Sequence, residues 1–167
     1  NDEFANRDKR LGWTVLGPGY KVLTSGVMAP MPMECNYSMT GYMLVKWLMP
    51  NRVNFLSGQD NNSILVFRYP EVLLNYAEAM NELGKMNQTV WNETVGLLRE
   101  RAGVKNIYPT EADPWLKQYY TKDLKHPFKT NGNEAVALEL RRERVTELIL
   151  EGGLRQSDLY RYAQMDL

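Results

Sequence analysis

Apolar residues recur with a helical period in three stretches of the chain after residue 64. In the first stretch, Pro70 stands at the start and Gly84 at the end, and the apolar residues between them follow spacings of three and four. This pattern predicts a helix over residues 70–83. Its expected buried face consists of Val72, Leu73, Tyr76, Ala77, Met80 and Leu83.

A second helical pattern covers residues 89–102 and ends at Gly103, after a short polar link. Two helices joined by so short a link predict an αα-hairpin of about the length of one tetratricopeptide unit, roughly 34 residues. One such unit cannot bury its apolar face alone, so a further helix is needed. The residues expected to face inward are Val90 or Trp91, Thr94, Val95, Leu98 and Ala102.

The third stretch, residues 134–151, combines an apolar stripe with a high density of charge. Asn131 or Asn133 is available as its N-cap, and two glycines follow it. A short further helix is expected beyond them, and residues 114–120 predict another helical turn. Because arginines and carboxylates alternate here, we expect ion pairs that hold helices together and keep the carboxylates ionised. The residues assigned to this structural ion-pair set are Glu143, Arg144, Glu147, Arg155 and Asp158.

Residues 1–63 differ in character, because Gly, Pro, Asn, Ser and Met break them into short pieces. The segments WTVL and YKVL flank Gly17–Gly19 and are expected to pair as a small hairpin. The rest is predicted to be mostly irregular, and an irregular stretch of this length tends to carry function or to belong to something larger. We therefore expect one domain with a loop-rich part, 1–63, and a helical part, 64–167.

Composition removes several classes of function. Twenty Lys and Arg balance twenty Asp and Glu, so no net field favours nucleic acid. One cysteine, Cys35, and one histidine, His126, are too few for a zinc site or a Cys/His nucleophile. The segment 60–62, DNN, is expected to be a plain turn rather than a calcium loop. We expect no cofactor, no metal ion and no membrane-spanning helix, because no apolar run approaches 18 residues.

Several blocks together resemble the C-terminal half of the SusD/RagB family, in the family's order and over nearly the whole chain. The blocks are NRDKRL (6–11), TGYMLVKW (40–47), FRYPEVLLNYAEAMNELGK (67–85), VGLLRERAGV (95–104) and LRRERVTELILEGGLRQSDLYRY (140–162). The resemblance implies a mainly α fold, a SusD-like α-α superhelix with tetratricopeptide-like helix hairpins, a long irregular region and a minor β-hairpin.

The chain also departs from the family's pattern. Lys9 stands where the family usually has proline, Val145 replaces a common arginine, and the glycine pair at 152–153 is one residue longer than usual. Family members are several hundred residues long, so we expect this chain to be a fragment of one domain. Cys35 is then not the lipid-bearing cysteine, and any lipid anchor lies outside this sequence.

The resemblance implies a non-catalytic outer-membrane lipoprotein at the cell surface. Such a protein would bind an oligosaccharide or other nutrient and deliver it to a SusC-like TonB-dependent transporter. Aromatic rings suit this task, because sugar rings present apolar C–H faces that stack on them while polar groups bond at the edge. The candidate ligand-binding residues, all before residue 63, are Trp13, Tyr20, Tyr37, Tyr42 and Trp47, with Asn36 and Asn51 as polar neighbours.

Two other classes of protein remain open from the sequence. A tetratricopeptide-like scaffold would bind a peptide in a groove between several stacked hairpins, although only one complete hairpin is visible. A glycoside hydrolase would need two carboxylates facing each other across a cleft. This class is less favoured, because the carboxylates of residues 139–158 alternate with arginines.

Overall fold

The computed structural model describes residues 3–31, 38–48, 63, 65–121 and 128–162. The chain divides into two units, Asn1–Ile64 and Leu65–Leu167. The described residues are mainly helical, with one small antiparallel hairpin, so the predicted mainly α class is confirmed. Cys35, Tyr37, Asn36, Asn51, the 60–62 turn and His126 all lie outside the described residues.

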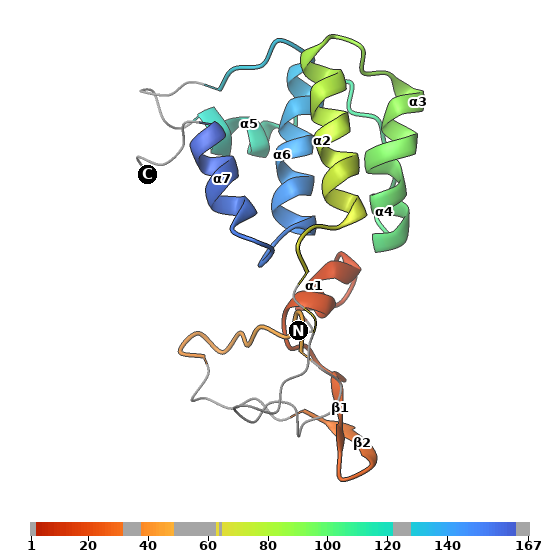
Figure 1. Cartoon of the computed structure of the whole chain (residues 1–167), viewed down its shortest axis with the longest axis vertical. Helices are drawn as coiled ribbons and strands as arrows, with labels where there is room; N and C mark the ends of the chain where they lie inside the picture. Colours follow the sequence, from red (N-terminus) through yellow and green to blue (C-terminus); the bar gives the residue numbers. More distant parts are fainter. Residues whose placement is uncertain (1–2, 32–37, 49–62, 64, 122–127, 163–167) are drawn as a thin grey trace. The chain divides into compact units, whose positions relative to one another are not determined.

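The helical unit is built around two long helices, α2 (Tyr69–Glu82) and α6 (Glu134–Glu147), which run side by side (Figure 1). Helix α2 begins with Pro70 in its first turn, where a missing N–H costs no hydrogen bond. Helix α6 is capped by Asn133, whose side chain accepts a hydrogen bond from the Val136 N–H at 3.2 Å. Both starts agree with the sequence prediction.

The second helix of the hairpin is continuous along the chain but changes its winding. It consists of α3 (Gln88–Trp91), a π-helical turn (Asn92–Gly96) and α4 (Leu97–Ala102), and it ends at Gly103 with φ of 70°. All six residues predicted to face inward are buried. Within the π-helical turn, the Thr94 hydroxyl donates to the Val90 carbonyl at 2.6 Å, which satisfies a buried polar group.

The core of the helical unit lies between α2, α6 and the α3–α4 helix. Trp91 is fully buried at its centre, donates its indole N–H to Asn106 Oδ1 at 2.9 Å, and meets the Tyr108 ring edge-on. The buried residues of this cluster are Leu73, Leu74, Ala77, Trp91, Val95, Leu98, Val136, Leu140 and Leu148.

The face of α2 that enters this core differs from the prediction. Leu73, Leu74, Ala77 and Asn81 are buried, whereas Val72, Tyr76 and Leu83 are about half exposed or more. Apolar residues surround much of this helix, so the helical period by itself is compatible with burial of either of two faces. The face that is buried includes a polar residue, Asn81, whose side-chain amide is hydrogen-bonded.

Asn81 joins the end of α2 to the start of α6. Its Oδ1 accepts from the Asn133 N–H at 3.1 Å and its Nδ2 donates to the Asn133 carbonyl at 3.3 Å. The backbone of Gly132 approaches so closely that a Cβ there would lie 2.0 Å from the Asn81 carbonyl oxygen. Glycine is therefore required where the incoming loop crosses α2.

Two shorter helices complete the unit: α5 (Pro114–Thr121) and α7 (Leu154–Arg161). Leu116 and Tyr120 of α5 pack against Leu138 of α6 in a second small core. Helix α6 ends at Glu147, four residues earlier than predicted. The chain then turns through Leu150, with φ of 62°, and Gly153, with φ of 72°, is the N-cap residue of α7.

The N-terminal unit contains α1 (Lys9–Thr14), β1 (Lys21–Thr24) and β2 (Val27–Pro30). The two strands pair antiparallel with Lys21 opposite Pro30 and Thr24 opposite Val27, and Ser25 and Gly26, both at positive φ, form the turn. The expected pairing of WTVL with YKVL is therefore wrong. Trp13 and Thr14 belong to a helix, and Val15 bridges instead to Leu44.

Candidate functional site

The site begins with the local structure of α1. Asp8 caps this helix by accepting the Arg10 N–H at 2.9 Å, and its carboxylate also binds the Arg10 guanidinium, with Nη2 to Oδ2 at 2.6 Å. A helix starting at Lys9 places Lys9, Gly12 and Trp13 on one face, because their spacing is i, i+3 and i+4. This face is directed to a surface hollow.

The hollow is an open cavity of about 380 Å³ inside the N-terminal unit. Trp13 and Tyr20, two of the residues predicted to bind ligand, both line it. Trp13 is 47% exposed, so nearly half of its surface reaches solvent. The lining residues are Phe4, Arg7, Asp8, Lys9, Gly12, Trp13, Gly17, Pro18, Gly19 and Tyr20; we call this cavity the α1 pocket.

Backbone hydrogen bonds fix the far wall of the α1 pocket. The Tyr20 N–H donates to the Gly17 carbonyl at 3.2 Å, and the Tyr20 carbonyl accepts from the Met31 N–H at 3.0 Å. The Phe4 ring lies against Gly17, where a Cβ would come within 2.8 Å of the ring. Partial burial raises the pKa of the Tyr20 hydroxyl, so this group stays a neutral donor and acceptor.

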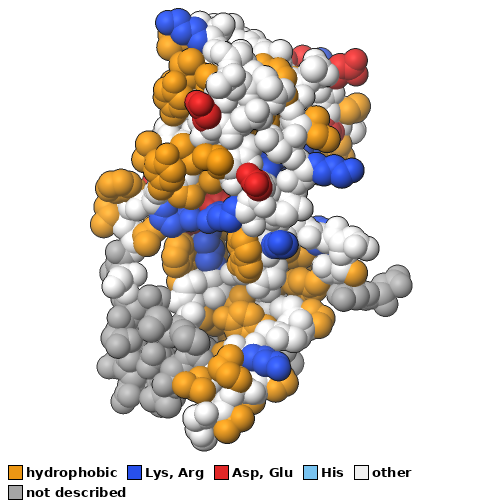
Figure 2. Space-filling model, turned by 90° about the vertical axis from the view of Figure 1, so that its right-hand side faces the viewer, with side chains coloured by type: hydrophobic (Ala, Val, Ile, Leu, Met, Phe, Trp, Pro, Cys, Tyr) orange, Lys and Arg blue, Asp and Glu red, His pale blue; other side chains and the backbone are white. Residues whose placement is uncertain are grey.

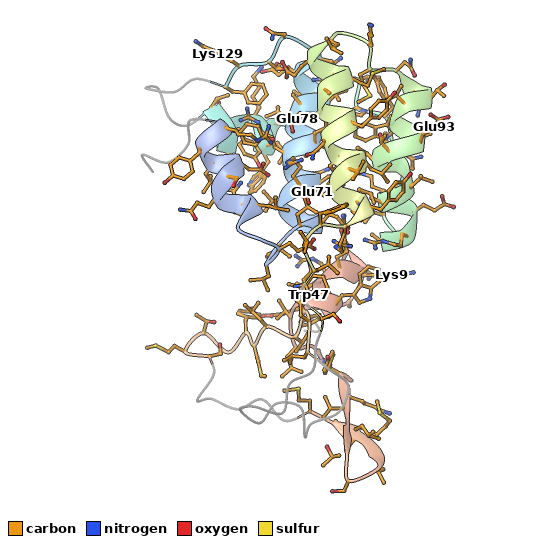
Figure 3. All side chains as sticks on the ribbon, viewed as in Figure 1. Lys9, Trp47, Glu71, Glu78, Glu93 and Lys129 are labelled. Carbon is orange, nitrogen blue, oxygen red and sulfur yellow. The ribbon has the colours of Figure 1, made fainter. Side chains whose placement is uncertain are left out.

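The other predicted ligand residues are not among the lining of the α1 pocket. Tyr42 is exposed and donates its hydroxyl to Glu3 Oε2 at 2.8 Å, which raises the pKa of Tyr42. Trp47, labelled in Figure 3, is 41% exposed and has φ of 73°, and the centre of its ring lies 5.3 Å from the Lys46 ammonium. Tyr37 lies outside the described residues. The structure thus brings together Trp13 and Tyr20.

Sequence reasoning overlooked Phe4, Arg7 and Lys9 as pocket residues. The spacing of Lys9 and Trp13 behind a capping aspartate is a usable signal for a helix, but the composition of the segment WTVL favours a strand. A second overlooked feature is the exposed pair Trp115 and Tyr119 on α5, whose rings stack with centroids 5.4 Å apart. These rings belong to the helical unit. Hydrophobic side chains reach the surface in both units on the face drawn in Figure 2.

The residues assigned to the structural ion-pair set lie on α6 and α7. Glu143 accepts from Arg99 Nε at 2.6 Å, and Glu139 beside it pairs with Arg99 and Arg142. Glu147 binds Arg68 at 2.9 Å and Arg101 at 2.6 Å.

Arg144 and Asp158 form the ion pair between these two helices. Two bonds join them: Nε to Oδ2 at 2.8 Å and Nη2 to Oδ1 at 2.9 Å. Arg155 forms no ion pair with any residue in the described part of the chain.

These contacts decide the protonation state of the carboxylates. Burial by itself would raise the pKa of Glu147 and of Asp158, but hydrogen bonds from two arginines to each carboxylate outweigh it and lower both values. Both groups are therefore ionised near neutral pH, and neither is a general acid. A hydrolase needs one carboxyl group held protonated, so this cluster does not suit one.

A second open cavity, of about 520 Å³, is lined by residues of α2, α6 and α7, and we call it the α2–α7 groove. Its charged residues bond mainly to one another. Glu78 accepts from Arg161 at 2.9 Å and from the Tyr162 hydroxyl at 3.1 Å, and Arg144 donates to Asn75 at 2.6 Å. Glu71 and Glu78, at this groove, are labelled in Figure 3.

Over the residues that the structure describes, no group of three or more His, Cys, Asp or Glu side chains is arranged to hold a metal ion. Likewise, none of the described helices has the length and apolar character needed to cross a membrane.

The chain was compared with curated proteins, with solved structures and with models of protein families. Neither the curated proteins nor the solved structures include one that matches. The model described as the SusD family matches residues 1–167. The chain therefore belongs to the SusD family, as the resemblance of its motifs predicted.

Proposed function

We propose that this protein binds a glycan or related nutrient in the α1 pocket and delivers it to a TonB-dependent outer-membrane transporter. Members of the SusD family are non-catalytic, carbohydrate- or nutrient-binding proteins of the cell surface. The observation that carries the assignment to this pocket is that Trp13 and Tyr20 line one cavity although six residues separate them.

The chemistry of the pocket supports this proposal. An exposed indole offers a flat apolar surface to the C–H face of a sugar ring, and the Tyr20 hydroxyl supplies a hydrogen bond at its edge. A volume of about 380 Å³ has room for one or two sugar rings, and the open mouth lets a longer chain continue beyond it. No bond is broken in this function, so the paired carboxylates of α6 serve only to hold helices together.

The test is a glycan array probed with the full-length protein, followed by calorimetric titration of the glycans that bind. Trp13→Ala should weaken binding by about tenfold, because the stacking surface is lost. Trp115→Ala is the matched control, since this tryptophan is also exposed but lies in the other unit. Absence of any glycan binding, or equal affinity of Trp13→Ala and the parent protein, would contradict the proposal.

Delivery and location need separate experiments. We expect a TonB-dependent transporter to copurify with the tagged protein from detergent-treated outer membranes. We also expect protease added to intact cells to remove the protein, as for a lipid-anchored surface protein. Protection from protease in intact cells would contradict the surface location without affecting the binding result.

A protein-interaction scaffold is the second candidate function. It is favoured by the exposed apolar row along α2, formed by Tyr69, Val72, Tyr76 and Leu83. These residues follow spacings of three, four and seven and lie on the surface of the helix hairpin. Peptide-array binding that Tyr76→Ala abolishes and Trp13→Ala leaves intact would favour this scaffold function over glycan binding.

A further inference from the structure

Two cationic side chains line the α1 pocket beside its aromatic rings. Arg7 and Lys9 are both exposed and stand on either side of Asp8 in the chain. Figure 3 shows the Lys9 side chain extending away from α1. Within the part of the chain that the structure describes, neither residue forms an ion pair or a side-chain hydrogen bond.

The single acidic residue among the described lining residues does not balance these charges. Asp8 is bound by Arg10, with three contacts of 2.6 to 3.0 Å between guanidinium and carboxylate. Because of these contacts, the positive charge of Arg10, which is 5% exposed, compensates the negative charge of Asp8 at the start of α1. Two positive charges thus remain at the pocket.

A neighbouring acid is also engaged elsewhere. Glu3 accepts the Tyr42 hydroxyl at 2.8 Å and is not among the residues that line the α1 pocket. The chain as a whole carries no net charge, with 20 cationic and 20 acidic residues. The excess of two cations at this pocket is therefore a local feature and not a consequence of a basic protein.

We propose that the ligand of the α1 pocket is an acidic glycan, whose carboxylate or sulfate groups bind Arg7 and Lys9 while a sugar ring stacks on Trp13. This inference rests on the proposed function and names the class of glycan. A guanidinium presents paired donors to a planar carboxylate or a sulfate, and an ammonium adds a second positive charge. The anionic group is the shared chemistry, and uronic acids and sulfate esters are its two sources.

The experiment compares acidic oligosaccharides with neutral partners of the same backbone, by titration of the full-length protein. Oligogalacturonate of seven sugars is paired with its fully methyl-esterified form, which tests the carboxylate source. A κ-carrageenan hexasaccharide is paired with its desulfated form, which tests the sulfate source. Maltoheptaose and xylohexaose are included as neutral probes.

We expect at least one acidic probe to bind about fivefold to tenfold more tightly than its neutral partner, as two exposed ion pairs would provide. The double variant Arg7→Gln/Lys9→Gln should remove this difference, so that the acidic probe and its neutral partner bind with about equal affinity. Raising NaCl from 50 to 500 mM should also reduce the difference in affinity between the acidic probe and its neutral partner, because salt screens exposed charges. The control Lys85→Gln/Lys105→Gln removes two exposed lysines of the helical unit and should change nothing.

The outcomes separate this inference from the proposed function. Suppose that a neutral glycan binds and that this binding depends on Trp13. If no acidic probe then binds more tightly than its neutral partner, or if the double variant does not change that preference, the acidic-glycan inference alone is overturned. No binding of any acidic or neutral glycan would overturn the proposed function itself. Circular dichroism of each variant verifies folding, which is expected because both substituted side chains are exposed.

Discussion

The two units of this protein use the same kinds of side chain in opposite ways. In the helical unit, Arg99 and Arg144 are each 4% exposed and bind carboxylates of other helices. In the N-terminal unit, Arg7, Lys9 and Trp13 stand exposed around a cavity. Charges that are paired and buried fix one geometry, whereas charges and rings left at the surface are available to a ligand.

This difference predicts where substitutions act. Changes to the buried pairs should reduce stability and leave the intrinsic affinity of the α1 pocket unchanged. Changes around the pocket should reduce affinity with little loss of stability. Each experiment below therefore measures both the free energy of unfolding and the affinity for a bound glycan.

The largest effect is expected for Arg99→Met. Arg99 binds Glu143 and Glu139, and its guanidinium also lies 5.1 Å from the centre of the Trp91 ring. Removing it leaves Glu143 buried without this partner, which should cost about 3–5 kcal/mol in urea denaturation followed by circular dichroism. Arg142→Met is the control, because that side chain is 42% exposed and should cost about 1 kcal/mol or less. Equal costs for the two variants would contradict the role given to burial.

Asp158→Asn is expected to have the next largest effect, and its size should depend on pH. The substitution removes a charge bound by Arg144 and Arg161, which should cost about 2–3 kcal/mol at pH 7. Because the arginines lower the pKa of Asp158 below its ordinary value of 3.8, its stabilisation is present above that pH and is lost as pH falls through the lower, folded value.

The difference in unfolding free energy between parent and Asp158→Asn should therefore be constant from pH 7 to about 5. It should narrow below about pH 4. Urea titrations at pH 7, 5, 4 and 3 measure this change. A difference that widens in acid would mean that the Asp158 carboxyl is protonated more readily in the folded protein than in the unfolded chain.

Gly17→Ala tests the N-terminal unit with a smaller expected effect. The added methyl group would meet the Phe4 ring at 2.8 Å, so the ring must move and reshape the α1 pocket. We expect the affinity for a bound glycan to fall by about threefold, with a change in stability below about 1 kcal/mol. Gly12→Ala is the control for stability, because nothing in the protein lies within 4 Å of the added Cβ. It should leave the free energy of unfolding unchanged to within about 0.5 kcal/mol.

The smallest effect is expected for Tyr42→Phe. Its hydroxyl makes one exposed hydrogen bond, to Glu3, so the variant should lose no more than about 0.5 kcal/mol of stability. Since Tyr42 does not line the α1 pocket, glycan affinity should change by less than about twofold. A larger loss of affinity would extend the binding surface to Tyr42 and restore the role that the sequence suggested for it.

Much of the helical unit could be predicted because its signals are local. Pro70, Asn133 and Gly103 mark helix ends through backbone geometry and capping bonds that involve only neighbouring residues. The inward residues of 89–102 were also predicted correctly, since one face there is clearly apolar. The buried face of α2 was not predicted correctly, because apolar residues surround much of this helix and only packing against the other helices selects which of them are buried.

The type of residue at the candidate site could be predicted from the sequence, but which of these residues share a cavity could not. The sequence indicated aromatic residues before residue 63 as ligand contacts, but the prediction for residues 13–16 was a strand, which placed Trp13 outside a helix. The helix around Trp13 depends on the Asp8 cap, and Val15 pairs with Leu44, nearly thirty residues away. A long-range pairing of this kind leaves no periodic signal within either segment.

By itself, the sequence determined the family, the mainly α class and the positions of most helix ends, because family motifs, helical period and caps are written in nearby residues. Only the tertiary structure decided that Trp13 and Tyr20 line one cavity, that Arg10 binds Asp8, and that Arg7 and Lys9 line the same cavity. It also decided that Arg99 and Arg68, far along the chain, pair with the acids of α6. The physical reason is that burial and pairing depend on which distant segments meet, and charge or aromatic character alone does not specify that.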